Sequence, residues 1–133
     1  MDDAAFILKN ILKKYKENIE AAVALAEIET RMGEYEVALV RLQKMDKVFP
    51  SFSPLIEAKA MVYYKSGDYA TAAEEYHRAT KLKPKEPELY YNLGLVYINL
   101  RQYKKAEVFF RKTLRFNPRH KFAQAMLRSL PQP

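Results

Sequence analysis

The sequence contains no cysteine, and only three glycines and two histidines, among its 133 residues. The absence of cysteine excludes disulfides, thiolate zinc sites, iron–sulfur clusters and thiol nucleophiles. The scarcity of glycine argues against a loop-rich fold, and apolar runs of about six residues are far too short to span a bilayer. The acidic start Met1-Asp2-Asp3 does not predict a signal peptide. We therefore expect a cytoplasmic or similarly reducing location, unless the sequence is a fragment that omits a targeting segment.

The two histidines do not form part of a recognisable reaction centre. His77 lies in a charged stretch after Glu74 and Glu75, and His120 follows a short linker, so both are expected to be solvated. Metal binding would require further ligands at matching spacing. Adjacent carboxylates such as Glu74 and Glu75 diverge on a helix, which argues against an acid–base pair. Without a glycine-rich phosphate loop either, the sequence predicts no enzyme, no cofactor and no metal ion.

Three segments of the chain superimpose at a period of 34 residues. An alanine and a proline recur in every segment, at Ala38, Ala72 and Ala106 and at Pro50, Pro84 and Pro118. Within residues 53–86 the apolar residues follow three- and four-residue spacing on both sides of Gly67, which predicts two amphipathic helices. A fixed period of this length indicates a stack of similar two-helix units.

The pattern resembles the tetratricopeptide repeat, whose motif combines aromatic, Leu-Gly, alanine and proline positions. The third segment carries most of it, at Tyr90, Leu93, Gly94, Tyr97, Tyr103, Ala106, Phe110 and Pro118. Two positions depart from the motif: Glu29 replaces an aromatic residue in the first segment, and Arg101 replaces a turn glycine in the third. The resemblance implies an all-α fold, a right-handed α-solenoid of stacked antiparallel helix pairs, with a tighter or slightly strained turn at Arg101.

The same period suggests a division of the whole chain, which is expected to form a single domain. Residues 1–18 would form an N-terminal helix, the second helix of an incomplete repeat. Residues 19–52, 53–86 and 87–120 would form three repeats, and residues 121–133 a capping helix and tail. This division predicts eight helices.

The resemblance also implies a binding groove, because the first helices of such repeats line a concave face. The residues that map onto this face are Glu27, Arg31, Glu57, Met61, Tyr64, Lys65, Tyr91, Asn92, Leu95 and Asn99. Met61, Tyr64, Tyr91 and Leu95 suit an apolar anchor, although Tyr91 and Leu95 equally suit packing between repeats or onto the capping helix. Relatives that bind chaperone carboxylates need cationic donors at set positions. Only Asn92 matches that set, so a carboxylate clamp is not expected.

The net charge of +7 is concentrated near the end of the chain, where residues 87–120 carry seven bases and two acids. An exposed basic surface is predicted at Arg101, Lys104, Lys105, Arg111, Lys112 and Arg115. Such a surface can meet an acidic protein, a membrane or nucleic acid. Phe109, Phe110 and Phe116 are assigned mostly to the core, so no aromatic platform is expected among the bases. A solvated face is therefore favoured over nucleic acid or membrane partners.

These features favour a non-enzymatic adaptor that binds a protein or peptide partner in the groove. One alternative is self-association, because the N-terminal helix carries a broad apolar face that includes Phe6, Ile7 and Leu12. Another alternative is electrostatic docking through the basic surface. The sequence does not identify the partner.

Overall fold

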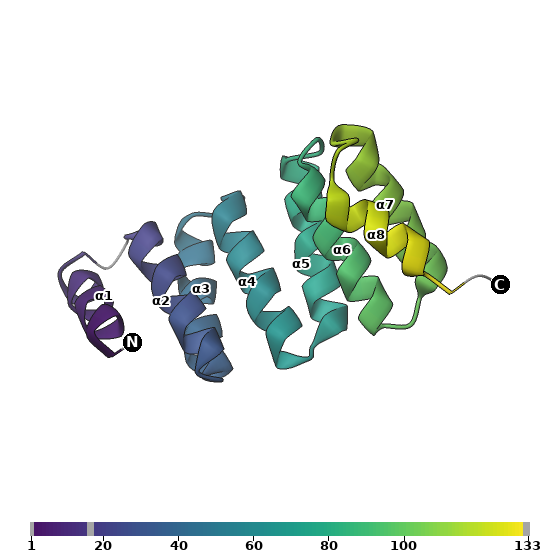
Figure 1. Cartoon of the computed structure of the whole chain (residues 1–133). Helices are drawn as coiled ribbons and strands as arrows, with labels where there is room; N and C mark the ends of the chain where they lie inside the picture. Colours follow the sequence, from purple (N-terminus) through teal and green to yellow (C-terminus); the bar gives the residue numbers. More distant parts are fainter. Residues whose placement is uncertain (1, 16–17, 132–133) are drawn as a thin grey trace. The chain divides into compact units, whose positions relative to one another are not determined.

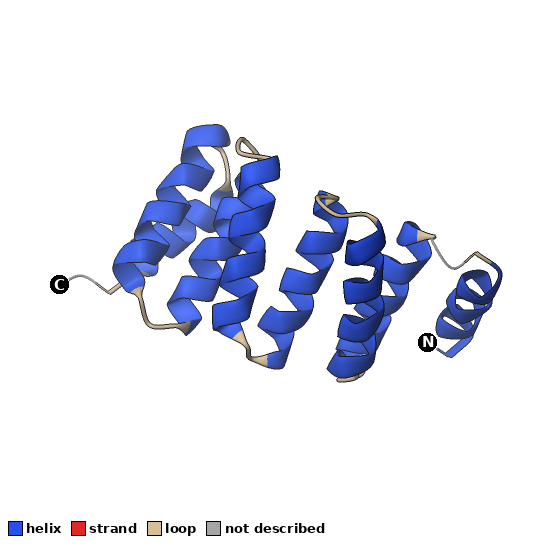
Figure 2. Ribbon diagram, turned by 180° about the vertical axis from the view of Figure 1, so that it is seen from behind, coloured by secondary structure: helices blue, strands red, loops and turns tan. Residues whose placement is uncertain are grey.

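A computed structural model describes residues 2–15 and 18–131, which form eight α-helices and no strand (Figure 1). Short loops join the helices (Figure 2). The expected all-α fold is therefore confirmed for the described part of the chain. The predicted segments 1–18 and 121–133 include residues 1, 16–17 and 132–133, which lie outside the described residues. Two compact units are present, Met1–Asp68 and Tyr69–Pro133.

The first unit contains four helices: α1 (Asp2–Lys14), α2 (Ile19–Arg31), α3 (Tyr35–Val48) and α4 (Ser53–Ser66). Helix α2 packs against the other three, and α3 also packs against α4. The side chain of Asn18 caps α2 by accepting a hydrogen bond from the Ala21 amide at 2.9 Å. This cap satisfies one of the amide groups that a helix start leaves without an intrahelical partner.

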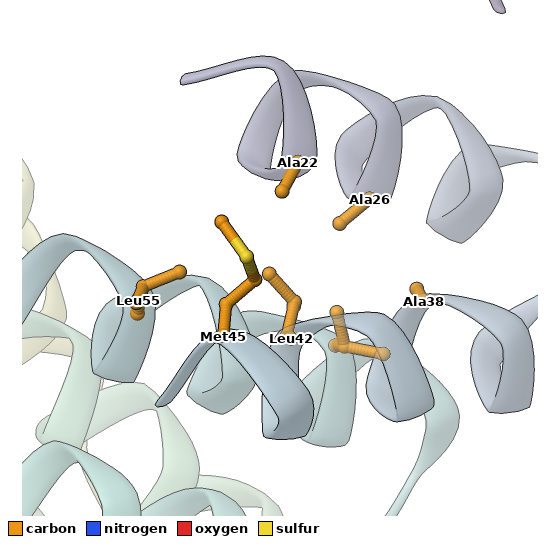
Figure 3. Packing of buried hydrophobic residues seen from close by; sticks show 7 residues of the cluster. Ala22, Ala26, Ala38, Leu42, Met45 and Leu55 are labelled. Carbon is orange, nitrogen blue, oxygen red and sulfur yellow. The ribbon is translucent and has the colours of Figure 1, made fainter. Parts of the chain in front are cut away.

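Small side chains allow the helices of the first unit to approach closely. Its buried core cluster consists of Ala22, Ala26, Ala38, Leu42, Met45, Leu55 and Val62. Figure 3 shows Ala22 and Ala26 of α2 opposite Leu42 and Met45 of α3. Helix axes about 8–10 Å apart require such an alternation of small and large residues. The alanines that recur in the sequence therefore serve packing.

The second unit contains α5 (Tyr69–Leu82), α6 (Pro87–Asn99), α7 (Tyr103–Phe116) and α8 (Lys121–Ser129), and each helix packs against the next. Helices α6 and α7 are in close contact at Gly94 and the fully buried Phe110. A methyl group at Gly94 would overlap the Phe110 ring. Glycine is therefore needed here for close approach.

The turns that follow α2, α4 and α6 all use a left-handed residue. Gly33 and Gly67 have φ angles of 79° and 92°, and Arg101 has a φ of 59°. A residue with a Cβ atom is disfavoured in this region by about 1–2 kcal/mol, whereas glycine is not. The expected strain at Arg101 is thus present in the backbone.

Helix α8 is attached to the second unit by His120 at its start. The expectation that His120 is solvated is wrong, because the residue is only 7% exposed. Its Nδ1 accepts a hydrogen bond from the Ala123 amide at 3.0 Å, and its Nε2 lies 2.7 Å from Glu88 Oε1. Since Nδ1 is an acceptor, the proton of the neutral ring is on Nε2, which donates to the carboxylate. His120 therefore links α8 to α6.

Candidate functional site

The groove residues predicted in the first unit lie on α2 and α4, two helices that pack against one another. Glu27, Arg31 and Lys65 are exposed, and the Ser53 hydroxyl donates a hydrogen bond to the half-buried Glu57 at 3.0 Å. Met61 is 36% exposed, one turn before the half-buried Tyr64. Residues three and four apart share a helix face. Helix α4 therefore presents Met61 and Tyr64 between charged side chains. We define the α2–α4 face as the six predicted groove residues of this unit: Glu27, Arg31, Glu57, Met61, Tyr64 and Lys65.

The groove residues predicted in the second unit all lie on α6, and part of this set is occupied by internal contacts. The Tyr91 ring lies 4.7 Å from the His120 ring and 6.4 Å from the Phe122 ring, measured between centroids. The Asn99 amide donates to the Leu95 carbonyl at 3.0 Å. Asn92 and Leu95 are half-buried. Tyr91 therefore contributes to the attachment of α8, in line with the packing alternative.

The apolar residues predicted for self-association occupy two environments on α1. Phe6 and Ile7 are 66% and 56% exposed. Leu12 is half-buried and packs against the core cluster of the first unit. Phe6 and Ile7 are thus the available apolar side chains of this set.

A buried ion pair occupies the position where Glu29 replaces an aromatic residue. Glu29 is 2% exposed and binds the Arg41 guanidinium through both carboxylate oxygens, with a 3.0 Å distance from Oε2 to Nη2. In the repeat 68 residues later, these two positions are Tyr97 and Phe109. Those rings are stacked, with centroids 5.4 Å apart. The ion pair in the first unit therefore replaces an aromatic stack.

A cavity of about 410 Å³ lies beside this ion pair, between α1 and α2. Its lining includes Phe6, Ile28, Glu29 and Met32. The cavity therefore borders the position that departs from the repeat motif.

A second ion pair, between Lys59 of α4 and Asp46 of α3, was not anticipated from the sequence. Lys59 is 7% exposed, and its Nζ lies 3.1 Å from Asp46 Oδ2. The repeat could have indicated this ion pair, because Lys59 occupies the position that Leu25 and Leu93 hold in the other two repeats. A charge at a position that is otherwise apolar requires a buried partner.

All six predicted basic residues are exposed, and three of them lie over aromatic rings. Lys105 Nζ lies 5.4 Å from the centroid of the Tyr97 ring. Lys112 Nζ lies 5.5 Å from the Tyr90 centroid and 5.6 Å from the Phe109 centroid. Arg115 lies over Phe116 at 5.7 Å. By contrast, Arg111 pairs with Glu107 at 3.0 Å.

His77 contacts two of these rings, those of Tyr97 and Phe109, and the expectation that it is solvated is also wrong. The residue is half-buried, with its Nε2 2.9 Å from the Tyr97 hydroxyl and its ring 5.5 Å from the Phe109 centroid. Burial lowers the pKa of His77, and the positive charges of Lys105, Lys112 and Lys81 lower it further. Burial raises the pKa of the Tyr97 hydroxyl.

Within the described residues, no cluster of three or more histidine or carboxylate side chains is arranged to bind a metal ion. In the same part of the chain, no helix combines the length and the apolar character that a membrane span requires.

Comparisons with protein families and curated proteins agree on one type of repeat. Residues 60–101 match the family described as TPR repeat, and residues 87–120 match the tetratricopeptide repeat. The chain is 29% identical over 100 residues to the BBSome complex member BBS4 of Mus musculus, covering 75% of this chain and 19% of that protein. It is 33% identical over 81 residues to the TPR repeat-containing protein MJ1428 of Methanocaldococcus jannaschii, covering 61% and 14%. The chain therefore spans about a fifth or less of these relatives.

Solved structures share the fold at low identity. The crystal structure of MamA superimposes with a TM-score of 0.82 at 23% identity, covering 95% of this chain and 74% of that one. YrrB, described as a TPR protein with an unusual peptide-binding site, gives 0.81 at 18% identity, covering 93% and 64%. SycD, a type III secretion translocator chaperone of Yersinia enterocolitica, gives 0.76 at 17%, covering 83% and 89%. At these identities the likeness establishes the solenoid fold alone.

Proposed function

Because the chain belongs to the tetratricopeptide repeat family, we propose that it is a non-enzymatic adaptor that binds a peptide or helix of a partner protein. Repeats of this type generally support protein–protein interaction. The peptide-binding site described for YrrB, which has the same fold, supports a peptide as the class of ligand. The absence of cysteine is compatible with a reducing compartment, so the proposal includes a cytoplasmic location.

The α2–α4 face is the proposed binding surface. The observation that carries this choice is the exposed Met61 beside Tyr64 on α4, which packs against α2. A methionine side chain adapts its shape to an apolar partner. Around this anchor, Glu27, Arg31 and Lys65 provide charges of both signs that can set the orientation of a bound segment. Asn92 and Leu95 on α6 are the predicted residues of the second unit that we retain as a separate candidate surface.

The proposal can be tested with a peptide selected from a random display library on the immobilised chain. We expect the Met61→Ala/Tyr64→Ala variant to bind this peptide at least about tenfold more weakly, because an apolar anchor of this size dominates a small interface. The matched control is Val37→Ala/Val40→Ala, which truncates two exposed apolar residues of α3. Equal affinity for wild type and the Met61/Tyr64 variant, with the helical content intact, would reject the α2–α4 face.

Self-association through α1 is a second candidate, favoured by the exposure of Phe6 and Ile7. Large exposed apolar side chains close together are typical of interaction sites. Light scattering after size-exclusion chromatography would show a dimer for the wild type and a monomer for Phe6→Ser/Ile7→Ser. A wild-type chain that stays monomeric at high concentration would contradict this candidate.

Electrostatic docking through the basic surface is a third candidate. Its support is the exposure of all six bases, although Arg111 is already paired with Glu107. Binding to an anionic polymer would weaken steeply as salt is raised. An affinity that is constant between low and high salt would rule it out.

A further inference from the structure

Three lysines of the second unit converge around His77. Lys81 lies one helical turn after His77 on α5, whereas Lys105 and Lys112 lie on α7, four residues before and three residues after Phe109. The Phe109 ring makes an edge contact with the His77 ring at 5.5 Å. Burial lowers the pKa of His77, and the positive charges of all three ammonium groups lower it further. The three lysines and His77 form what we call the lysine cluster.

The positive charge of this cluster is not neutralised within the described part of the chain. None of Lys81, Lys105 and Lys112 forms an ion pair with a carboxylate of the described residues. Other bases of the same unit do: Arg78 pairs with Glu75 at 2.9 Å, and Arg111 with Glu107 at 3.0 Å. Exposed ammonium groups of one sign attract anionic groups from solution.

Aromatic rings position two of these ammonium groups. Phe116, Tyr90, Phe109 and Tyr97 form a ladder whose successive centroids are 5.6, 6.4 and 5.4 Å apart. Lys105 lies over Tyr97 at its end, and Lys112 lies over both Tyr90 and Phe109. A cation within about 6 Å of a ring centroid is attracted to the ring. The lysines are therefore partly ordered before any partner binds, which lowers the entropic cost of binding.

The burial of the rings distinguishes between anionic partners. Tyr90 and Tyr97 are only 7% and 9% exposed, and their faces are covered by neighbouring rings and by lysine. Single-stranded nucleic acid needs exposed aromatic faces on which its bases can stack. The cluster thus offers charge without a stacking platform, which suits carboxylates better than nucleotides.

We propose that the lysine cluster is a docking site for an acidic segment of a partner protein, whose aspartate or glutamate side chains pair with Lys81, Lys105 and Lys112. The site is formed by α5, α6 and α7 alone. It does not depend on ligand binding at the α2–α4 face.

A labelled glutamate-rich peptide and its glutamine counterpart test the proposal by fluorescence anisotropy. We expect the glutamate peptide to bind the wild type, and Lys105→Gln/Lys112→Gln to weaken binding roughly fivefold to tenfold, as for the loss of two partly exposed ion pairs. The matched control is Lys104→Gln/Arg111→Gln, which removes the same charge at the same spacing of seven residues from α7. This control should change the affinity less than about twofold, because only long-range charge is lost.

Two further measurements complete the test. If Lys105→Gln/Lys112→Gln does not fold, Lys81→Gln leaves both lysines on their rings and should still weaken binding roughly twofold to threefold. At constant pH, the His77 ring signals should shift when the glutamate peptide binds to the wild type. Equal losses in the two double variants, or binding of the glutamine peptide with the same affinity, would overturn the proposal. It would also be overturned if an oligonucleotide or a phosphatidylserine vesicle, but not the peptide, bound through the cluster.

Discussion

The buried ion pair of Glu29 and Arg41 provides the sharpest test of how this chain departs from its repeat. Arg41→Met would keep an apolar stem but leave the Glu29 carboxylate, at 2% exposure, without its cation. Removing one partner of a buried pair typically costs about 3–5 kcal/mol. Because the Arg41 side chain is 23% exposed, we expect the lower end, a loss of about 3 kcal/mol in the free energy of unfolding.

The double exchange Glu29→Tyr/Arg41→Phe should reverse this loss. It would recreate in the first unit the stack that Tyr97 and Phe109 form in the second, and it would place a ring beside the cavity of about 410 Å³. Replacing a buried ion pair by apolar residues is often neutral or stabilising by about 1–4 kcal/mol. An aromatic pair adds about 0.5–1.5 kcal/mol. We therefore expect the double variant to be at least as stable as the wild type.

Urea denaturation followed by circular dichroism measures both effects. The four proteins of the double-mutant cycle are the wild type, Glu29→Tyr, Arg41→Phe and the double variant, and Arg41→Met is measured beside them. We expect each single change to be destabilising. We also expect the m-value, the slope of the unfolding free energy against urea concentration, to stay unchanged, so that differences in the urea midpoint report differences in stability. The reasoning is refuted if Arg41→Met loses less than about 1 kcal/mol, or if the double variant is less stable than both single variants.

Three other predictions concern single residues of the second unit. Arg101→Gly should raise the free energy of unfolding by about 0.5–1 kcal/mol in thermal denaturation, because glycine removes the penalty of a φ of 59°; a lower melting temperature would contradict this. Gly94→Ala should cost about 1–3 kcal/mol in urea, since its methyl group overlaps the Phe110 ring, and unchanged stability would show that the helices separate freely. The lowered pKa of His77 means that the unfolded chain binds more protons just below the ordinary value of 6.5. The free energy of unfolding should therefore fall as the pH drops below 6.5 towards the folded-state pKa of His77. The His77→Gln variant should lose less stability over this pH range. An identical pH profile for both proteins would exclude His77 as the source of the pH dependence. The groups that face His77 are Tyr97, Lys81, Lys105 and Lys112.

The period of the sequence predicted the packing residues well, because these positions have the same neighbours in every repeat. Ala38, Leu42 and Met45 are buried in the first unit, and Ala106 and Phe110 in the second. Glu29 was recognised as a departure from the motif. Its partner Arg41 was not, because the motif does not specify that position and only the packing of α3 on α2 brings the two together.

The histidines and lysines show where prediction from neighbours along the chain fails. His77 and His120 lie among charged or linker residues in the sequence, yet Tyr97 contacts the first and Glu88 the second from α6. Lys105 and Lys112 were correctly expected to be exposed, but their position over aromatic rings depends on contacts between α6 and α7. The rings of Tyr90 and Tyr97 occupy motif positions, but Lys105 and Lys112 do not. Periodicity therefore carries no information about these contacts.

The most direct test of peptide binding at the α2–α4 face uses the five methionines of the chain as probes. The methyl groups are labelled with carbon-13, and the peptide selected by display is titrated in while methyl NMR spectra are recorded. Met61 lies on the proposed face, Met45 in the core, Met32 at the cavity and Met126 on α8. The account predicts that the Met61 signal shifts most and that Met126 is unaffected. A peptide that binds and shifts Met126 or Met32 while Met61 stays unchanged would contradict it.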